Sequence, residues 1–322
     1  MGRGAHPQVT AGAEPDRVQD RRRSTDEHAR WEFEEGASIE AGRTVLRRLG
    51  GGSRYEVYLA WDEHLFSLAV AKLLRPDQVD DERSLRELSQ EAEVLDALEH
   101  PVIVRGFDAV LEGPHPHLLI EHLEGPSLRR LIRRGGALPL QQLLPLALHV
   151  AGALAYLSHE RTVHLDVKPD NIIMGVPPRL IDLSIARSLE RAARTSSPIG
   201  TDAYMPPEQC DPRAHQDGIG PASDVWGLGA TLHHAVGGRV PFPREKGARD
   251  SEELGVRFPQ LTEDPEPLPE AVPGELRDLI LTMLSKYPRR RPDAAEVAAG
   301  LEPLVAELPR KLVLSRRGGG FR

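Results

Sequence analysis

The sequence predicts an α+β protein with two lobes: a small antiparallel β-sheet lobe that contains one helix, and a larger, mainly α-helical lobe. Apolar residues follow a strand-like pattern from Thr44 to about Leu123, one helical segment interrupts it, and from Leu138 the pattern is mostly helical. The change of pattern places the joint between the lobes at residues 122–125. A cleft between two lobes is a usual place for a ligand.

The clearest strand of the small lobe covers residues 55–62, where side chains alternate with a period of two, as in a half-buried strand. The alternating sets are Tyr55, Val57, Leu59 and Trp61, and Glu56, Tyr58, Ala60 and Asp62. An apolar run from Phe66 to Leu74 predicts the next strand. In residues 84–98 apolar positions recur every three or four residues, which predicts a helix that ends at His100-Pro101.

The larger lobe is expected to contain four main helices, with short strands around the loop at residues 164–171. The predicted helices span residues 138–158, 221–236, 275–284 and 294–304. The first is long and apolar, so we expect it in the core.

Composition narrows the class of protein. The chain has 322 residues, 39% of them hydrophobic and 28% charged, which allows one large domain or two lobes around a real core. The net charge of −8 argues against a general nucleic-acid binder, which needs a basic face. With Cys210 as the single cysteine, an internal disulfide and a cysteine metal cluster are excluded.

The two ends of the chain lack hydrophobic periodicity. The expected divisions are a disordered N-terminal tail (1–38), a folded domain (39–308) with lobes 39–123 and 124–308, and a basic, flexible C-terminal tail (309–322). The longest apolar run, 143–157, is shorter than the roughly 20 residues of a membrane span. We therefore expect a cytoplasmic protein with no secretory signal and no membrane span.

Three consecutive glycines, Gly50, Gly51 and Gly52, would let a backbone turn approach phosphate oxygens, because no Cβ intervenes. Alone this is a weak signal, since a plain hairpin turn has the same composition. A dinucleotide-binding fold would continue from the glycines into a helix, whereas here the strand from Tyr55 follows. This order argues against a dinucleotide oxidoreductase and suits a loop folded over a nucleotide.

Lys72 ends the apolar stretch Ala69-Val70-Ala71. A lysine in this position usually extends to solvent. The alternative is an ammonium directed at nucleotide phosphates, which would need a carboxylate partner. Glu87, Glu91 and Glu93 on the following helix are all candidates, and periodicity does not choose among them.

Residues 164–171, with the sequence HLDVKPDN, carry the most chemistry. They place a possible base, Asp166, a cation, Lys168, and an amide metal ligand, Asn171, on one short loop, with the carboxylate of Asp182 one hairpin away. Phosphoryl transfer needs a positioned nucleophile, neutralised phosphates and bound magnesium. Magnesium prefers oxygen ligands, which an amide and a carboxylate provide.

Taken in order, these motifs resemble the bacterial, eukaryotic-like (Hanks-type) serine/threonine protein kinases. The resemblance runs from about Thr44 to about Leu304, over four-fifths of the chain. Further motifs that carry it are Ile120-Glu121-His122-Leu123, Gly200-Thr201, Pro206-Pro207-Glu208, Asp224-Val225-Trp226-Gly227-Leu228-Gly229 and Arg291-Pro292. Each is a common string, but all of them in one order form a specific signal. The resemblance implies the bilobal protein-kinase fold.

The resemblance also implies a role for each matching residue. Asp166 would orient the substrate hydroxyl and accept its proton, Lys168 would neutralise the γ-phosphate, and Lys72, held by Glu91, would grip the α- and β-phosphates. Asn171 and Asp182 would hold two Mg²⁺ ions, with Mn²⁺ as a substitute. The expected ATP contacts are Gly50, Gly52, Val57, Val70, Lys72, Ile120 as gatekeeper, the backbone of Glu121 and Leu123, and Ile173.

Partners implied by the resemblance are ATP and proteins with serine or threonine acceptors, with self-association for autophosphorylation. Lys168, two positions after the aspartate, and Thr201 are typical of serine/threonine kinases and differ from tyrosine kinases and aminoglycoside phosphotransferases. Asp224 would brace the catalytic loop, and Glu208 would pair with Arg291 as part of the architecture.

Four positions depart from the family pattern. Tyr55 replaces the third glycine of the loop, Val70 a small alanine, Leu165 the arginine before the catalytic aspartate, and Ser184 the glycine of the magnesium motif. That arginine receives the activation-loop phosphate in many kinases, and a leucine cannot do so. We therefore predict that phosphorylation of Thr195, Ser196 and Ser197 is not required for activity.

An active serine/threonine kinase is the preferred function. A nucleotide-binding pseudokinase that acts as a scaffold would agree with Tyr55 and Ser184, although pseudokinases typically lose one of the charged residues present here. A small-molecule phosphotransferase is opposed by Lys168 and residues 200–208.

Overall fold

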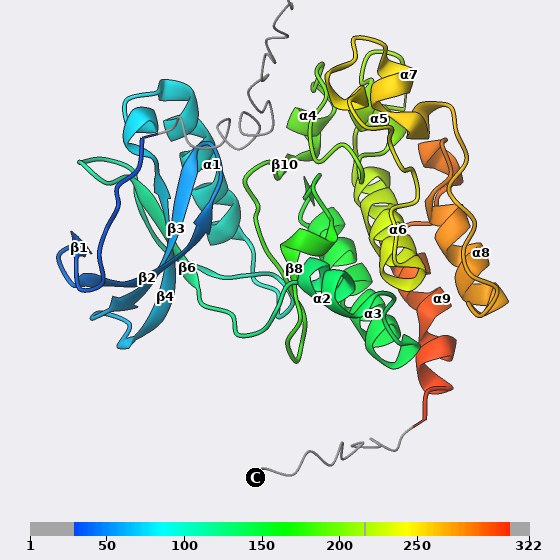
Figure 1. Ribbon diagram of the computed structural model, residues 1–322, viewed down its shortest axis with the longest axis horizontal. Coiled ribbons are helices and arrows are strands. Elements are labelled where there is room, and N and C mark those ends of the chain that lie inside the picture. The colour runs from blue at the N-terminus through cyan, green and yellow to red at the C-terminus, as the bar shows by residue number, and fades with distance from the viewer. Residues whose placement is uncertain (1–28, 216, 310–322) are drawn as a thin grey trace, which may run out of the picture.

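The computed structural model describes residues 29–215 and 217–309 and has the two lobes that the sequence predicts (Figure 1). The small lobe is a six-stranded sheet with strand order β1-β2-β3-β4-β6-β5, and all neighbouring strands are antiparallel. The strands are β1 (Ser38–Glu40), β2 (Arg43–Gly51), β3 (Tyr55–Asp62), β4 (Ser67–Leu74), β5 (Gly106–Val110) and β6 (His117–Glu121). Helix α1 (Glu82–Ala97) packs against β5 and β6 and confirms the helix expected at residues 84–98.

The register of the sheet brings the expected nucleotide contacts onto neighbouring strands. Val57 on β3 is opposite Lys72 on β4, and Val70 on β4 is opposite Ile120 on β6. Gly50 on β2 is opposite Val57, so the glycine loop lies next to these expected contact residues. Residues that are 70 positions apart in the sequence are thereby placed within one face of the sheet.

Residues 29–38 are not part of a disordered tail, so the expected boundary at residue 38 is wrong; residues 1–28 lie outside the described residues. Trp31 and Phe33 pack against the buried cluster on the outer face of the sheet. This cover also corrects the expectation that β3 is half-buried, because Glu56 is 0% exposed and accepts from the Trp31 N–H. Asp62, 1% exposed, is instead buried beside Arg43 and the turn at residues 63–66. The covering segment is remote in sequence, so the alternation within β3 could not reveal it.

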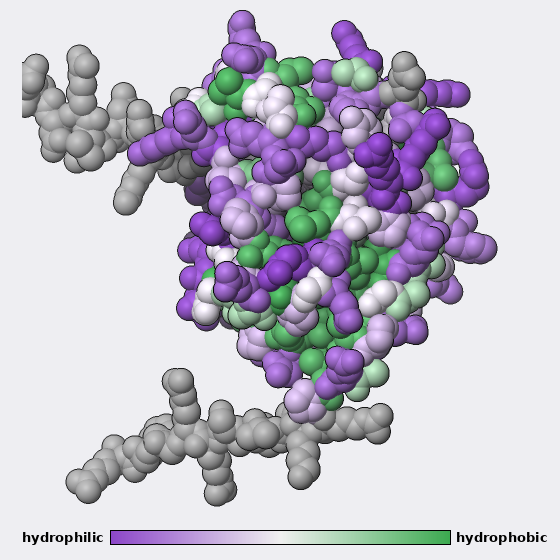
Figure 2. Space-filling view, turned by 90° about the vertical axis from the view of Figure 1, so that its right-hand side faces the viewer, coloured by the Kyte–Doolittle hydropathy of each residue, from purple (hydrophilic) through white to green (hydrophobic). Residues whose placement is uncertain are grey.

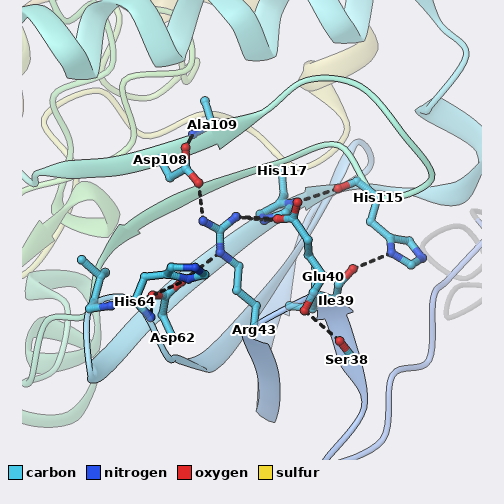
Figure 3. Close-up of polar contacts among 11 residues, drawn as sticks. Ser38, Ile39, Glu40, Arg43, Asp62, His64, Asp108, Ala109, His115 and His117 are labelled. Atoms are coloured by element: carbon cyan, nitrogen blue, oxygen red, sulfur yellow. Dashed lines mark hydrogen bonds and ion pairs between the residues drawn. The ribbon is translucent and has the colours of Figure 1, made fainter.

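A buried arginine ties five strands together at one end of the sheet (Figure 3). The guanidinium of Arg43, on β2, donates to Asp62 of β3 and Glu40 of β1 at 2.9 Å and to Asp108 of β5. It also lies 2.9 Å from Nε2 of His117 on β6. Burial lowers the pKa of His117, so this ring is neutral and its Nε2 accepts from the guanidinium.

The helical lobe is built around a long apolar helix, as expected. The main helices are α2 (Leu128–Gly135), α3 (Leu140–His159), α6 (Pro221–Gly237), α8 (Gly274–Met283) and α9 (Ala294–Ala306). All but α2 match the predicted ranges closely, and α2 was missed. By length and composition alone α3 could cross a membrane, but it packs against α6 and α9 as the core helix of this lobe.

Short elements complete the helical lobe. They are β7 (Thr162–Val163), β8 (Ile172–Ile173), β9 (Arg179–Leu180), β10 (Arg187–Ser188), α4 (Leu189–Ala192), α5 (Pro207–Cys210) and α7 (Leu254–Arg257). β7 pairs with β10, and β8 pairs with β9. Figure 2 looks onto the helical lobe and shows a mostly hydrophilic face with apolar residues gathered between the charged ones.

We expect replacement of Arg43 by Met to destabilise the small lobe. The change leaves the buried carboxylate of Asp62 without its cation, and removing one partner of a buried ion pair typically costs about 3–5 kcal/mol. The measurement is the free energy of unfolding in denaturant. Arg47→Met, on the exposed side of the same strand, is the matched control and should change it by less than about 0.5 kcal/mol. Equal losses in both variants would contradict the role of Arg43.

Candidate active site

The loop after β7 is held by a buried carboxylate from the helical lobe. Asp224 of α6, 4% exposed, accepts hydrogen bonds from the backbone N–H groups of His164 and Leu165, both at 2.7 Å. Leu165 has a φ of 65°, a left-handed conformation that is uncommon for a leucine. The two bonds fix this conformation and are the bracing contact expected of Asp224.

Asp166, Lys168 and Asn171 converge at the end of this loop. Lys168 Nζ lies 2.5 Å from Asp166 Oδ2 and 2.7 Å from the hydroxyl of Thr201. The Asn171 amide nitrogen donates to the backbone oxygen of Asp166 at 3.0 Å and to its Oδ2 at 3.2 Å. The other carboxylate oxygen, Asp166 Oδ1, is buried and has no hydrogen-bond partner among the described residues. One oxygen is therefore fixed, and the other is free to accept a proton donor.

Asp182 is placed beside this loop by the β8–β9 hairpin. The Ile181 N–H donates to the backbone oxygen of Asn171 at 2.9 Å, and a ring nitrogen of His164 lies 3.2 Å from the Ile181 carbonyl. Asp182 itself has a φ of 65°. These contacts connect the backbone before Asp182 to the loop that carries Asp166 and Asn171.

Lys72 joins the two lobes electrostatically. Its Nζ lies 2.8 Å from both carboxylate oxygens of Glu91 on α1 and 3.0 Å from Asp182 Oδ1. Burial would lower the pKa of Lys72, but the two carboxylates raise it, so the ammonium stays charged. Burial opposes ionisation of Asp182, yet Lys72 and a hydrogen bond from Ser184 hold the pKa of Asp182 well below its usual range.

Glu91 is thus the partner of Lys72 among the three candidate glutamates. The Asp81 side chain caps α1 by accepting from the Ser84 N–H at 2.8 Å. With this start of the helix, Glu91 faces the sheet and is buried. Glu87 instead pairs with the arginines at positions 54 and 83 at the lobe surface.

Tyr55, which replaces the third glycine, covers the ammonium of Lys72. The distance from Nζ to the ring centroid is 4.7 Å, within the range of a cation–π contact. Burial raises the pKa of Tyr55 to about 12, and its buried hydroxyl has no hydrogen-bond partner among the described residues. The ring therefore shields the Lys72–Glu91 pair from water.

The glycine loop leaves room for a ligand at two of its three glycines. A Cβ added at Gly50 or Gly52 would meet nothing within 4 Å, whereas one at Gly51 would lie 2.5 Å from the Tyr55 carbonyl oxygen. Gly51 is therefore required by the turn itself. Beside Gly50 and Gly52 the space that a Cβ would fill is empty, while the Gly52 N–H donates to the Tyr55 carbonyl at 2.9 Å.

The other residues expected to contact a nucleotide lie on the sheet and the linker between the lobes. The Glu121 N–H donates to the Arg105 carbonyl at 2.9 Å, so this N–H is not available to a ligand. Leu123 follows on the linker and is half-buried. Ile173 on β8 forms an isolated antiparallel β-bridge with Ser127. Val70 on β4 is 8% exposed.

The residues present fit a divalent cation that is also bound by phosphates. Asn171 uses its amide nitrogen to bond Asp166, which leaves its amide oxygen for a cation, and Asp182 is ionised. In residues 29–215 and 217–309, no three His, Cys, Asp or Glu side chains are grouped so as to hold a metal ion. A cation here would therefore need further ligands from a nucleotide.

Leu165, which replaces the arginine of the family pattern, is buried among apolar side chains. Its side chain is 3% exposed and packs with Val163, Ala192 and Ile219 in an apolar cluster. In the activation segment, Arg187 donates to the Thr195 hydroxyl at 3.3 Å.

Together, this geometry and the sequence define a protein kinase domain. A family model for the protein kinase domain matches residues 43–300, and the chain belongs to this family. It is 31% identical over 297 residues to the serine/threonine-protein kinase PknB of Mycobacterium leprae, which covers 85% of this chain and 46% of that protein.

Two further relatives carry similar names. The probable serine/threonine-protein kinase PkwA of Thermomonospora curvata is 32% identical over 260 residues, covering 80% of this chain and 33% of the relative. The serine/threonine-protein kinase PrkC of Bacillus subtilis is 29% identical over 267 residues, covering 81% and 40%. The chain therefore spans less than half the length of these relatives.

Sequence reasoning missed several contacts between the lobes. Gln90 on α1 donates to the Ala186 carbonyl at 2.8 Å, and Arg179 on β9 lies 2.9 Å from Glu121 Oε1. No motif marks these residues in a single sequence.

The expected ion pair of Glu208 with Arg291 is present, with contacts of 2.6 and 2.9 Å.

Proposed function

We propose that this protein is an ATP-dependent serine/threonine protein kinase, which transfers the γ-phosphate of ATP to serine or threonine hydroxyls of proteins. The observation that carries the proposal is the pair of oxygens on Asp166, one fixed by Lys168 and Asn171 and the other free to accept. The names of the relatives support the choice of acceptor, as does the Lys168–Thr201 contact.

In this mechanism, the acceptor hydroxyl donates a hydrogen bond to Asp166 Oδ1, which orients its oxygen toward the γ-phosphorus. As the new O–P bond forms, the bond from the γ-phosphorus to the bridging oxygen of ADP breaks, and the hydroxyl proton passes to Asp166. Lys168 neutralises charge on the transferred group, and Lys72 binds the α- and β-phosphates. Mg²⁺, when bound by Asp182 and Asn171, would offset the charge on the phosphates.

The small lobe would hold the base of ATP. Val57 and Val70 would contact one side of the adenine ring and Ile173 the other, with Ile120 behind it. The Glu121 carbonyl and the Leu123 N–H would bond its polar edge, and Gly50 and Gly52 would approach the phosphates. Support comes from the register that places these residues on adjoining strands.

Regulation is proposed to be independent of activation-loop phosphorylation. Two observations favour this. Leu165 lies in a buried apolar cluster and offers no charge to a phosphate, and Arg187 already donates a hydrogen bond to the Thr195 hydroxyl. We also infer a cytoplasmic location for this domain, and self-association where autophosphorylation takes place between two copies.

The alternative function is a nucleotide-binding pseudokinase scaffold. It is favoured by the Tyr55 ring over Lys72, which narrows the approach of phosphates to the ammonium. Thermal stabilisation by ATP without any phosphate transfer would select the scaffold over the kinase.

Replacing Asp166 by Ala is expected to lower turnover by about 10²–10⁴, the usual contribution of a positioned acid or base. The measurement is phosphate transfer from radiolabelled ATP with Mg²⁺ to a generic protein acceptor. ATP affinity should change little, because Asp166 acts on the acceptor. Asp278→Ala, a surface carboxylate on α8, is the control and should keep full turnover. Undiminished transfer by the Asp166 variant would overturn the assignment.

Replacing Thr195, Ser196 and Ser197 together by Ala should keep turnover within about threefold of wild type, because the change removes one hydrogen bond from Arg187 and no required phosphate. The comparison protein is wild type treated with phosphatase and checked by mass spectrometry. A loss of two orders of magnitude in the triple variant would show that phosphorylation is needed.

A further inference from the structure

The segment before the sheet, residues 29–31, is bonded to strands β3 and β4 and, through Arg75, to the glycine loop. We name residues 29–31 the N-terminal brace. Trp31 Nε1 donates to the Leu74 carbonyl at 2.7 Å, two residues beyond Lys72 on β4. The Trp31 N–H donates to Glu56 Oε2 at 3.1 Å, next to Val57 on β3. The brace therefore touches both strands that carry nucleotide contacts.

Arg75 connects the brace to the glycine loop directly. This arginine is 4% exposed, and its Nε donates to the Gly52 carbonyl at 2.7 Å. Its Nη1 donates to the Ala29 carbonyl of the brace at 3.2 Å. The Arg75 N–H also donates to the Arg54 carbonyl at 2.8 Å. Three carbonyls from two separate segments are thus fixed by one residue.

A buried carboxylate holds this arginine in place. Glu56 is 0% exposed, and its Oε1 lies 3.6 Å from Arg75 Nη1 and 3.4 Å from Arg48 Nη2. Its Oε2 accepts from the Tyr58 hydroxyl at 2.9 Å in addition to Trp31. A buried charge is stable only when it is paired and hydrogen-bonded. Oε2 of Glu56 is hydrogen-bonded, whereas Oε1 makes no hydrogen bond among the described residues and attracts Arg75 through its charge.

We propose that the N-terminal brace, acting through Arg75 and Glu56, positions the glycine loop for nucleotide binding. Arg75 and Glu56 are positioning residues, because the brace is connected to the glycine loop through Arg75, which binds the carbonyls of Ala29 and Gly52. The Gly52 carbonyl cannot lift away without breaking a charge-assisted hydrogen bond, so the loop is held over the site before ATP arrives. Loss of the brace should weaken ATP binding and leave the transfer step intact. This inference rests on the proposed kinase function.

The test is a KM-against-kcat comparison with Mg–ATP in the full chain, together with the Kd measured by calorimetry. Arg75→Lys keeps the charge but cannot reach both the Gly52 and Ala29 carbonyls. It should raise the Kd and the KM for Mg–ATP by about tenfold, with kcat little changed. Trp31→Phe removes the Nε1–H donor while keeping an aromatic ring, and should raise both by about threefold.

The matched control is Phe33→Leu. Phe33 covers the same face of the sheet and packs on Tyr58, but its side chain has no polar atom that could bond to these strands. It should bind Mg–ATP as wild type does. Hydrogen exchange should also speed up at residues 50–54 in the first two variants and not in the control. If Arg75→Lys fails to fold, Trp31→Phe carries the test alone.

The outcomes separate the two proposals. Failure of wild type to bind Mg–ATP would refute the proposed kinase function. If wild type binds Mg–ATP, and Arg75→Lys, Trp31→Phe and Phe33→Leu bind it with the same affinity, the proposed role of the brace is refuted and the kinase function is not. Weaker binding in all three variants would assign the effect to general loss of sheet cover and would also refute it.

Discussion

The ammonium of Lys72 lies between two carboxylates, one from each lobe, and the arrangement of the site depends on it. Glu91 comes from the helix of the small lobe and Asp182 from the hairpin of the large lobe. The Lys72 side chain is only 12% exposed, and a lysine so far removed from water is stable as a cation only when it is paired. Its requirement for partners therefore sets the position of α1 against the sheet and of Asp182 against the catalytic loop.

Buried charge is used repeatedly in the small lobe, and for two different purposes. Arg43 joins strands at one end of the sheet, where its partners are structural. Arg75 and Glu56 lie at the other end, where their partners are the backbone of the glycine loop and the N-terminal brace. Aromatic residues are only 4% of the chain, and Trp31 and Phe33 supply much of the cover over these charges. The small lobe thus relies on ion pairs where larger side chains could have filled a core.

Family motifs made most of the site predictable, while periodicity alone predicted the layout of strands and helices. Four long helices and the β3–β4 hairpin lie where their patterns place them, because their apolar faces are continuous in sequence. The burial of Glu56 was not predictable, since it depends on a covering segment remote in sequence, and the burial of Asp62 depends on Arg43 of the neighbouring strand. The choice of Glu91 over Glu87 and Glu93 followed from the family pattern and is explained by the start of α1 at its Asp81 cap. The contacts of Gln90 and Arg179 between the lobes had no signal in one sequence.

The most direct test of the account is calorimetric titration of ATP, with and without Mg²⁺, into wild type and Asp182→Asn. If Lys72 and Asp182 converge on one magnesium-bound triphosphate, Mg²⁺ should raise the affinity of wild type by about tenfold or more, and the variant should lose most of that gain. Equal dependence on Mg²⁺ in both proteins would contradict the convergence of the two lobes on a shared ligand.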